Sequence, residues 1–342
     1  MIGPEEATAS ASAVNSQAAP QFRLAVVIVN YRTPDFTIDC LQSLADKLDT
    51  ARDVVVIVDN ESGDDSPQRI AEHVARSGWA GWVRLIHSDT NVGFAAGNNI
   101  GLNAVTAELY LLLNSDTVVK NDAIDTLIDA MAQRPDVGIV SPKLVIPDGS
   151  TQNSCYRFTL PVNELCGAAR TRFLERLLHA PTLVIRPDDQ PVEVEWTSFA
   201  CALLRGRMLD DVGLLDGGYF MYFDDIDYCR MAHRKGWLVL NVPAATVLHR
   251  RGGSGDTVKN LAKRKRLPRY YWASRARYFA KNYGTVGLWW TNSLWTVGRL
   301  ISLAGELVGV KQPHAVELEW RDIWTNALHP LRMPRTPPKD AS

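Results

Sequence analysis

The stretch "LYLLLNSDTVVK" at residues 109–120 decides the fold class. Its five apolar residues run directly into Asn114, Ser115 and Asp116, which predicts a buried strand that ends in a carboxylate. Apolar runs of the same kind occur at residues 24–29, 54–58, 82–86 and 137–140, and they alternate with helix-like segments at about residues 35–47, 66–76, 95–104 and 121–133. This alternation predicts a parallel, right-handed, doubly wound α/β sheet, because continuous β-rich runs fit strands that are covered on both faces.

Polar side chains follow the predicted strands at the edge where such sheets bind their ligands. Asp, Asn and Ser also end strands for a local reason, because they favour turns and helix caps. Their coincidence on one edge favours a ligand site over this second explanation. They are Asn30, Tyr31 and Arg32 after the first strand, Asp59 and Asn60 after the second, His87 to Asn91 after the third, and Asn114, Ser115 and Asp116 after the fourth.

The composition is that of an ordinary globular chain. Its 342 residues, 46% of them hydrophobic, suffice for one large core and an appendage, and a net charge of −1 excludes a general attraction to nucleic acid. The five cysteines include no C-x-x-C pair, which argues against disulfides or a zinc cluster and favours a reducing cytosol. Residues 1–21 are mostly small and polar and lack the apolar core of a signal peptide, so we expect a disordered tail there.

The turn after the first strand narrows the kind of phosphate site. It reads "NYRTPD" at residues 30–35, without G-x-G-x-x-G, and the chain has no Walker loop. A glycine-rich phosphate cradle is therefore not expected. A divalent cation is the other common partner of a diphosphate, and Mg²⁺ or Mn²⁺ takes carboxylate oxygens together with substrate phosphates, which makes Asp116 the candidate ligand. The small residues of "NVGFAAGNN" at 91–99 would either let the chain pass close to a nucleotide ribose or begin a helix.

Four of these segments resemble a known family. "VVIVNYRTPDFTIDCLQSL", "VVIVDNESGDDS", "NVGFAAGNNIGL" and "LLLNSDTVV" are similar to the nucleotide-sugar half of the glycosyltransferase family 2 enzymes with the GT-A fold, especially the rhamnosyltransferase-like branch of bacterial polysaccharide assembly. The resemblance implies a nucleotide-diphospho-sugar donor, a divalent cation on a D-x-D-like motif, and inversion at the anomeric carbon. The motif here is Asn114-Ser115-Asp116, so only Asp116 is carried over as a charged metal ligand.

The same resemblance implies roles for the rest of this edge. Asp59 would hydrogen-bond the base of the nucleotide, and Asn30 would line the nucleotide pocket. The other candidates for donor binding in this half are Tyr31, Asn60, Asn91, Gly97, Asn98, Asn114 and Ser115.

The second half of the chain, from Trp196 to Gly255, resembles the acceptor half of the family segment by segment. We therefore expect a catalytic domain over residues 22–255, with a nucleotide-sugar half at 22–141 and an acceptor half at 142–255.

Within the acceptor half, the stretch "FDDIDY" at residues 223–228 suits acid–base chemistry. An acceptor hydroxyl must lose its proton as it attacks the anomeric carbon, so a carboxylate must lie within hydrogen-bond reach. The family usually has Glu-Asp here with the second acid as the base, so the resemblance assigns Asp225 as the catalytic base, with Asp224 beside it. The alternative is that these acids only cap a helix.

His249 ends the apolar run "ATVLH" and precedes "RRGGSG". In the family this histidine approaches the metal or the diphosphate, so His249 is the second candidate metal ligand. Arg250 and Ser254 are candidate contacts of the leaving diphosphate, whose developing charge needs stabilisation. Trp196 is the candidate aromatic face for a sugar ring. A satisfied strand-end histidine and a tryptophan in ordinary core packing are the alternatives.

Residues 256–342 form a C-terminal region of basic and aromatic character, which we expect to be helical. Cations and aromatics interleave over 259–284, and an apolar stretch follows at 288–309. Arg299 and Glu306 interrupt that stretch, which argues against a membrane span of about 20 uncharged residues. We expect 259–309 to lie at a membrane interface, with a helical pair packed on the catalytic domain as the alternative. No nucleic-acid-binding motif accompanies the basic residues.

The sequence thus predicts an inverting, metal-dependent glycosyltransferase at the cytoplasmic face of the cell membrane. Its donor would be dTDP-rhamnose or a UDP-hexose, its acceptor a saccharide, expected to be lipid-linked, and its cofactor Mg²⁺ or Mn²⁺. A sugar-phosphate nucleotidylyltransferase is a weaker alternative, because it would begin with a G-G-x-G-T-R-like loop that the first turn lacks. A non-catalytic nucleotide-sugar-binding or scaffolding protein would keep Asp59 and Asp116 but would have no use for Asp225.

Overall fold

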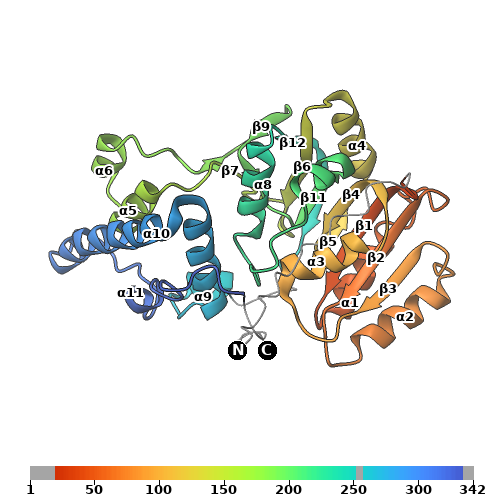
Figure 1. Ribbon diagram of the computed structural model, residues 1–342, viewed down its shortest axis with the longest axis horizontal. Coiled ribbons are helices and arrows are strands. Elements are labelled where there is room, and N and C mark those ends of the chain that lie inside the picture. Colours follow the sequence, from red (N-terminus) through yellow and green to blue (C-terminus); the bar gives the residue numbers. More distant parts are fainter. Residues whose placement is uncertain (1–19, 252–256, 334–342) are drawn as a thin grey trace, which may run out of the picture.

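The computed structural model describes residues 20–251 and 257–333 (Figure 1). The strands are β1 (Phe22–Asn30), β2 (Asp53–Asp59), β3 (Val83–His87), β4 (Ala107–Leu113), β5 (Thr117–Val119), β6 (Val137–Val145), β7 (Cys155–Tyr156), β8 (Val184–Ile185), β9 (Val192–Val194), β10 (Trp196–Thr197), β11 (Cys201–Arg205) and β12 (Leu238–His249). The helices are α1 (Pro34–Gln42), α2 (Ser66–Arg76), α3 (Gly93–Asn103), α4 (Ala123–Gln133), α5 (Pro161–Ala169), α6 (Arg172–Leu177), α7 (Gly206–Val212), α8 (Asp224–Arg234), α9 (Thr257–Ala262), α10 (Arg269–Leu307) and α11 (Glu319–Asp322).

The main sheet is mixed, with the order β3-β2-β1-β4-β11-β6-β12-β5 and β9 attached to β12. The run from β3 to β4 is parallel, as predicted. β11 lies antiparallel to both β4 and β6, so the five predicted strands, β6 included, all run in the same direction, and the additional strand β11 makes the sheet mixed. The reason is the path of the chain: it leaves the sheet after β6 and returns at the same edge, beside the end of β4, which reverses the direction of β11.

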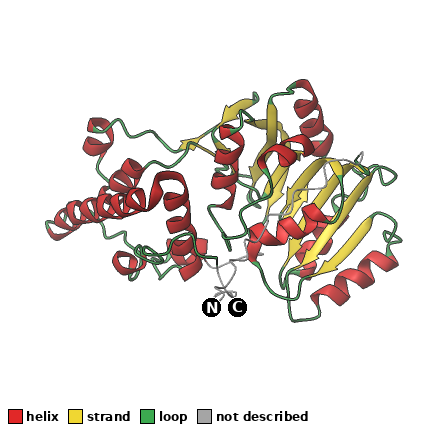
Figure 2. Cartoon of the chain, in the orientation of Figure 1, coloured by secondary structure: helices red, strands yellow, loops and turns green. Residues whose placement is uncertain are grey.

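The central strands are apolar throughout because alternate residues feed two separate cores. In β1, Leu24 and Val26 belong to the core under α1, α2 and α4, whereas Ala25 and Val27 belong to the core under α3, α7 and α8. Helices accordingly cover both faces of the sheet (Figure 2). The doubly wound arrangement with two covered faces is therefore confirmed, although three strands, β5, β9 and β11, run the other way.

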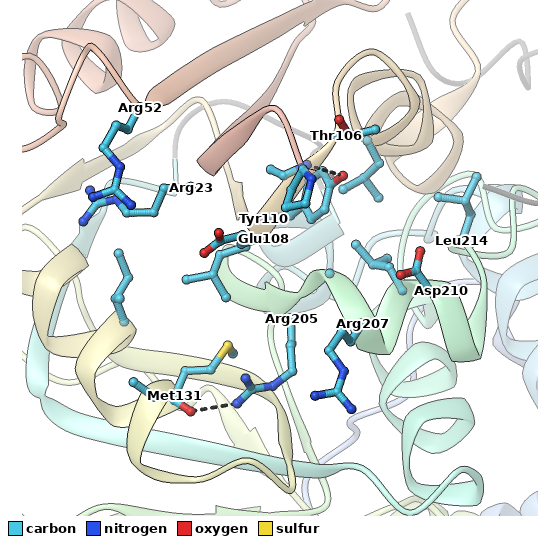
Figure 3. A pocket seen from close by; sticks show the side chains of 18 residues that line it. Arg23, Arg52, Thr106, Glu108, Tyr110, Met131, Arg205, Arg207, Asp210 and Leu214 are labelled. Carbon is cyan, nitrogen blue, oxygen red and sulfur yellow. Dashed lines mark hydrogen bonds between the residues drawn. The ribbon is translucent and has the colours of Figure 1, made fainter. Parts of the chain in front are cut away.

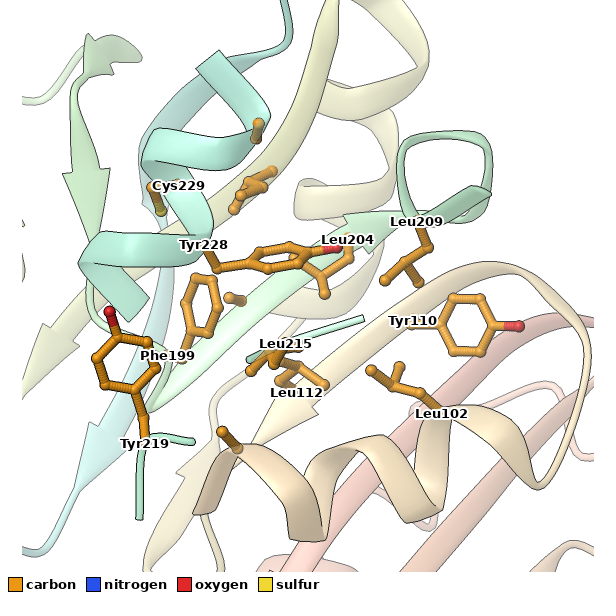
Figure 4. Close-up of a cluster of buried hydrophobic side chains, with 14 of the residues drawn as sticks. Leu102, Tyr110, Leu112, Phe199, Leu204, Leu209, Leu215, Tyr219, Tyr228 and Cys229 are labelled. Atoms are coloured by element: carbon orange, nitrogen blue, oxygen red, sulfur yellow. The ribbon is translucent and has the colours of Figure 1, made fainter. Parts of the chain in front are cut away.

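The core beside the acceptor half brings together residues from distant parts of the chain. Leu102 of α3, Leu112 of β4, Leu204 of β11 and Tyr228 of α8 are buried in one cluster, and Figure 4 shows their side chains gathered between the sheet and the helices. This cluster joins the two halves of the predicted catalytic domain into one body.

Small residues let α3 lie close to β1. A Cβ atom on Gly101 would lie 2.4 Å from Cγ1 of Val27. At the start of the helix, Gly93 has φ +84°, and a Cβ atom there would lie 2.2 Å from the carbonyl oxygen of Phe220. The backbone N–H of Phe94 donates to that oxygen at 2.7 Å. The stretch 91–99 therefore begins a helix, two residues earlier than predicted.

Five helices form a second body beside the sheet, which we call the helical lobe: α5, α6, α9, α10 and α11 (Figure 1). Its long helix α10 is bent at Gly284, where φ is 76° and ψ is 167°. Helix α5 packs along α10, with Arg275 Nη2 at 2.9 Å from Glu164 Oε2. The predicted C-terminal helices thus exist, but α5 and α6 join them from within the acceptor half of the sequence.

Charged contacts fasten the first part of α10 to the catalytic domain. Asp216 accepts from Arg277 at 2.7 Å and from Lys281 at 3.0 Å, and Lys281 also donates to Asp227 at 2.5 Å. The packed-helix alternative therefore describes residues 269–283. Among the described residues, no helix has the length and apolar character needed to cross a membrane.

Candidate active site

Asp116 and His249 meet at the edge where the parallel strands end. β12 pairs with β5 so that His249 lies opposite Thr117, and this register places His249 Nε2 at 3.2 Å from Asp116 Oδ1. The two side chains are 12% and 3% exposed. A second contact holds the pair, because the backbone N–H of Arg250 donates to the backbone oxygen of Asp116 at 2.9 Å. The two predicted metal ligands, 133 positions apart in the sequence, are thus neighbours.

The ring of His249 is held from its other side. Its Nδ1 atom lies 2.9 Å from Oε1 of Gln152, and Nε of Arg251 donates to the same oxygen at 3.0 Å. Gln152 is 9% exposed and follows the turn after β6. Sequence reasoning missed this residue, because a glutamine after an Asp-Gly-Ser turn carries no signal of its own.

The donor set suits a divalent cation that takes further ligands from a diphosphate. Oδ1 of Asn114 is buried and has no hydrogen-bond partner among the described residues. Ser115 Oγ lies 3.3 Å from Thr33 Oγ1, so it is directed toward the turn before α1. Residues 20–251 and 257–333 contain no group of three or more His, Cys, Asp or Glu side chains that would form a complete metal site by themselves.

Asp59 and Asn30 lie side by side at the ends of β2 and β1. Asn30 Nδ2 donates to Asp59 Oδ1 at 2.8 Å, and the hydroxyl of Ser62 donates to the same oxygen at 2.6 Å. Asp59 and Asn30 are buried, with exposures of 4% and 0%. Tyr31 lies at the rim, with the guanidinium of Arg32 at 5.1 Å from its ring. Ser62 completes this cluster, and sequence reasoning missed it because Ser in a Glu-Ser-Gly-Asp turn is ordinary.

Asn60 and Asn91 shape the loop that precedes α3. Asn60 Nδ2 donates to Asn91 Oδ1 at 3.0 Å, and the backbone N–H of Val92 donates to Asn60 Oδ1 at 3.0 Å. Asn98 Nδ2 donates back to the carbonyl oxygen of Phe94 at 2.9 Å, within α3.

Gly97 lies inside α3. A Cβ atom there would come within 3.1 Å of Cγ1 of Val29. Its contact with β1 lets the helix pack against the sheet behind this edge.

Asp224, Asp225 and Asp227 start helix α8. Asp224 and Asp227 share the buried face, with exposures of 5% and 1%, whereas Asp225 is half-buried on another side. The turn before the helix is unusual, because Tyr222 and Phe223 both have positive φ values, 68° and 65°. Non-glycine residues in this conformation concentrate at functional sites.

Burial raises the pKa values of the two neighbouring carboxyl groups, Asp224 and Asp225. It raises the pKa of Asp225 to about 6, opposed by the backbone N–H groups of Ile226 and Phe199. The pKa of Asp224 is raised well above its usual range by burial and by the charges of Asp225 and Asp227. The half-buried Asp225 is therefore ionised at neutral pH, whereas burial and the two neighbouring charges favour the protonated form of Asp224, which is the arrangement expected of a base beside a supporting acid.

The turn directly before β11 connects this base to the metal-ligand edge. The backbone N–H of Phe199 stabilises the Asp225 carboxylate, and the next carbonyl, of Ala200, accepts from the N–H of Asn114 at 2.9 Å. The charges of both Asp225 and Arg251 act on Tyr156. Burial is the main cause that raises the pKa of Tyr156; the charge of Asp225 raises it further, and the charge of Arg251 lowers it. Two consecutive residues, Phe199 and Ala200, therefore connect the predicted base to the predicted metal-ligand edge.

Trp196 and Arg250 occupy its periphery. Trp196 stacks on Tyr156, with ring centroids 4.3 Å apart and planes at 17°, and its Nε1 donates to the carbonyl oxygen of Arg157 at 2.9 Å. Arg250 pairs with Asp39 of α1. Ser254 lies outside the described residues.

A cavity of about 610 Å³ lies at the opposite edge of the sheet, where β1 and β4 begin (Figure 3). Two of its arginines have structural partners. Arg23 pairs with Asp53 at 2.5 Å, and Arg205 donates to the backbone oxygen of Val137 at 2.8 Å and to two carbonyls at the end of α4. This cavity is separate from the candidate active site.

Residues 20–268 match the family described as Glycosyltransferase like family 2. The chain belongs to this family. The match covers both the nucleotide-sugar edge and the start of α8, so the protein is a glycosyltransferase, and neither the nucleotidylyltransferase nor the scaffolding interpretation is needed.

This glycosyltransferase is similar to characterised relatives. It is 29% identical over 305 residues to the N-acetylglucosaminyl-diphospho-decaprenol L-rhamnosyltransferase of Mycobacterium tuberculosis, covering 83% of this chain and 92% of the relative. It is 24% identical over 216 residues to the low-salt glycan biosynthesis hexosyltransferase Agl10 of Haloferax volcanii, covering 62% of each chain. The predicted rhamnosyltransferase-like kinship is therefore confirmed.

Solved structures confirm the GT-A fold. GalNAc-T7 with UDP, GalNAc and Mn²⁺ aligns with a TM-score of 0.54 and 14% identity, over 92% of this chain and 59% of that chain. The mannosyltransferase PcManGT of Pyrobaculum calidifontis, in complex with GDP-Man and Mn²⁺, aligns with a TM-score of 0.51 and 16% identity, over 92% of this chain and 88% of that one.

Proposed function

We propose that this glycosyltransferase moves a sugar from a nucleotide-diphospho-sugar to a saccharide hydroxyl, with inversion and with a divalent cation, Mg²⁺ or Mn²⁺. The observation that carries the proposal is the pairing of Asp116 with His249, an edge that Phe199 and Ala200 connect to the Asp225 carboxylate. Asp116 and His249 would hold the cation, which supplies positive charge to the diphosphate of the donor.

The protein's own residues would account for the transfer itself. Asp225 accepts the proton of the acceptor hydroxyl while the oxygen of that hydroxyl forms a bond to the anomeric carbon. On the opposite face of the sugar, the bond from the anomeric carbon to the diphosphate breaks. The raised pKa of Asp224 favours its protonated form, so Asp224 would leave the role of base to Asp225. Arg250 would contact the leaving diphosphate, whose charge grows as the bond breaks. Trp196, stacked on Tyr156, would present an aromatic face to the acceptor.

The donor we propose is dTDP-rhamnose or a UDP-hexose. Oδ1 of Asp59 is occupied by Asn30 and Ser62, while Oδ2 receives a single hydrogen bond from the Ser62 N–H at 3.2 Å. A carboxylate oxygen has room for a further donor, such as the imino N–H of uracil or thymine. Tyr31 and the Asn60 and Asn91 loop would border the nucleotide.

The acceptor we propose is a lipid-linked saccharide of bacterial cell-surface polysaccharide synthesis, reached at the cytoplasmic face of the membrane. The mycobacterial relative is named for a diphospho-decaprenol acceptor, and this chain covers 92% of that relative. Membrane contact would follow from such an acceptor.

Exposed apolar side chains at the far end of the helical lobe support that contact. We call them the lobe tip: Phe173, Leu177, Leu307, Val308 and Val310, which are 69%, 58%, 86%, 73% and 77% exposed. Lys311 joins the two segments of the tip, since its Nζ donates to the backbone oxygen of Ala169 at 2.6 Å. Exposed arginines flank the tip at 172 and 176, and the exposed basic stretch 263–266 lies in the same lobe. Apolar groups rimmed by cations are suited to an anionic lipid surface.

A thermal-shift panel tests the donor site. Wild type and Asp116→Asn are heated with UDP, dTDP, GDP and their sugars, each with Mn²⁺, with Mg²⁺ and with EDTA. A ligand that binds only the folded protein raises Tm by mass action. We expect one nucleotide-sugar to raise the Tm of the wild type only with metal, and Asp116→Asn to lose that rise. If no nucleotide stabilises the protein under any of these conditions, the proposed donor site is wrong.

Flotation with lipid vesicles tests the membrane surface. Wild type is expected to float with vesicles that contain anionic lipid, and Leu307→Glu with Val310→Glu should weaken this binding at least several-fold. Val286→Glu is the matched control, because Val286 is 84% exposed but lies at the other end of the second part of α10. Equal flotation of both variants and wild type would rule out the lobe tip as the contact.

A further inference from the structure

We propose that Gln152 and Arg251 are positioning residues that lock His249 in the tautomer with the proton on Nδ1, so that Nε2 is free to bind the cation. This inference rests on the proposed function for the identity of the ligand. The lock itself is a property of the protein's own hydrogen bonds and can be tested without any cation.

The hydrogen-bond roles follow from Arg251. The Nε atom of an arginine only donates, so the Gln152 atom that lies 3.0 Å from it must be an acceptor. That atom is Oε1, and it also lies 2.9 Å from Nδ1 of His249. A carbonyl oxygen cannot donate, so Nδ1 must carry the proton. Arg251 thereby fixes the orientation of the amide, and the amide fixes the tautomer of the ring.

The consequence appears on the other side of the ring. With Nδ1 donating to Gln152, Nε2 is the ring nitrogen directed toward Asp116 Oδ1, 3.2 Å away. In the neutral form of the ring the lone pair then lies on Nε2. The opposite tautomer would carry its proton on Nε2, on the side where the cation would bind. Gln152 therefore directs the metal-binding nitrogen of the ring toward the metal-ligand edge.

The backbone holds Gln152 firmly enough for this role. Its N–H donates to the carbonyl oxygen of Leu144 at 2.9 Å, and Val145 of β6 forms a bridge with Thr151. The turn between them uses Gly149 at φ +84°, a conformation that favours glycine. The position of the Gln152 amide beside His249 is thus fixed by a short turn that is hydrogen-bonded to the end of β6, the strand next to β12. Outer partners of this kind tune metal affinity by about 10- to 100-fold.

The test measures the tautomer and the metal separately. Nitrogen NMR of the imidazole rings, recorded on the full chain at about pH 8 without metal, distinguishes protonated Nδ1 from protonated Nε2. His249→Gln identifies the signal among the seven histidines. Mn²⁺ binding is followed by the EPR signal of the free ion, first with Mn²⁺ alone and then with dTDP or UDP added.

Three variants are compared with wild type. Gln152→Leu removes the acceptor, Gln152→Glu keeps an acceptor of the same reach, and Gln133→Leu makes the same change at an exposed site. We expect Nδ1–H in wild type and in Gln152→Glu, and a shift to Nε2–H in Gln152→Leu with Mn²⁺ bound about 10- to 100-fold more weakly. Gln133→Leu should match wild type, and unchanged Tm values show that the fold is intact.

Two results would overturn the inference: Nε2–H in metal-free wild type, or Mn²⁺ affinity in Gln152→Leu within about threefold of wild type. Failure of the proposed function would look different. The ring would then keep the Nδ1–H form, while no nucleotide-sugar would stabilise or react with the wild-type protein.

Discussion

Replacing Asp225 by Asn tests the proposed base directly. Burial raises the pKa of this carboxyl group to about 6, so it is ionised at neutral pH and protonated as the pH falls through that value. A general base works only when ionised, so kcat/KM for the acceptor should fall about tenfold for each pH unit below about 6. An unperturbed aspartate would place the same limb near about 4. Asp225→Asn should lower the rate by about 100- to 10,000-fold at neutral pH.

Initial rates of sugar transfer between about pH 5 and 8 supply the measurement, with the donor that the thermal-shift panel identifies. Asp46→Asn is the matched control, because its side chain is 78% exposed and it lies after α1, away from the site. Asp225→Asn should leave Tm unchanged or raised, since burial disfavours the carboxylate that it removes. A variant within about tenfold of wild type, or an acid limb near 6 that survives in it, would refute the assignment.

Two further predictions concern the stability of the fold. Lys281→Ala leaves the buried Asp227 without its ion-pair partner, so the free energy of unfolding should fall by about 2–3 kcal/mol in denaturant titrations; an unchanged midpoint would show that α10 does not depend on this contact. Gly101→Ala should cost about 1–3 kcal/mol because its Cβ would meet Val27, whereas Gly167→Ala, in α5 with no atom within 4 Å of its Cβ, should be neutral or stabilising by up to about 1 kcal/mol. Equal midpoints for both variants would contradict the close packing of α3 on β1.

The strands of the first half could be predicted from the sequence because each carries a dense apolar signal. The run at 54–58 lies within β2, whose residues from Val54 to Val58 are almost completely buried. The direction of β11 could not be predicted in this way. Its five residues have no pattern that encodes orientation, and the reversal results from the long excursion of the chain between β6 and β11.

The residues of the candidate site differ in the same way, because some carry a local sequence signal and others do not. Asp116 could be selected from the sequence because a carboxylate directly after a buried strand has a chemical reason to be there, whereas His249 and Asp225 were selected because their segments resemble those of the family. Gln152 was missed because its role depends on a partner 97 positions away. Such a contact leaves no trace in local spacing, so only the tertiary structure identifies it.

The two-part origin of the helical lobe limits how this enzyme can be taken apart or recombined. Its core joins α5, inserted within the catalytic half, to α10 near the end of the chain. A chain that ends at residue 268 would lack α10, so the face of α5 that packs on α10 would be exposed. Asp227 in α8 would also lose its ion-pair partner Lys281. Exchange of the C-terminal region alone between relatives would create mismatched surfaces. Any change of acceptor that works through the lobe requires the insertion and the C-terminal helices to change together.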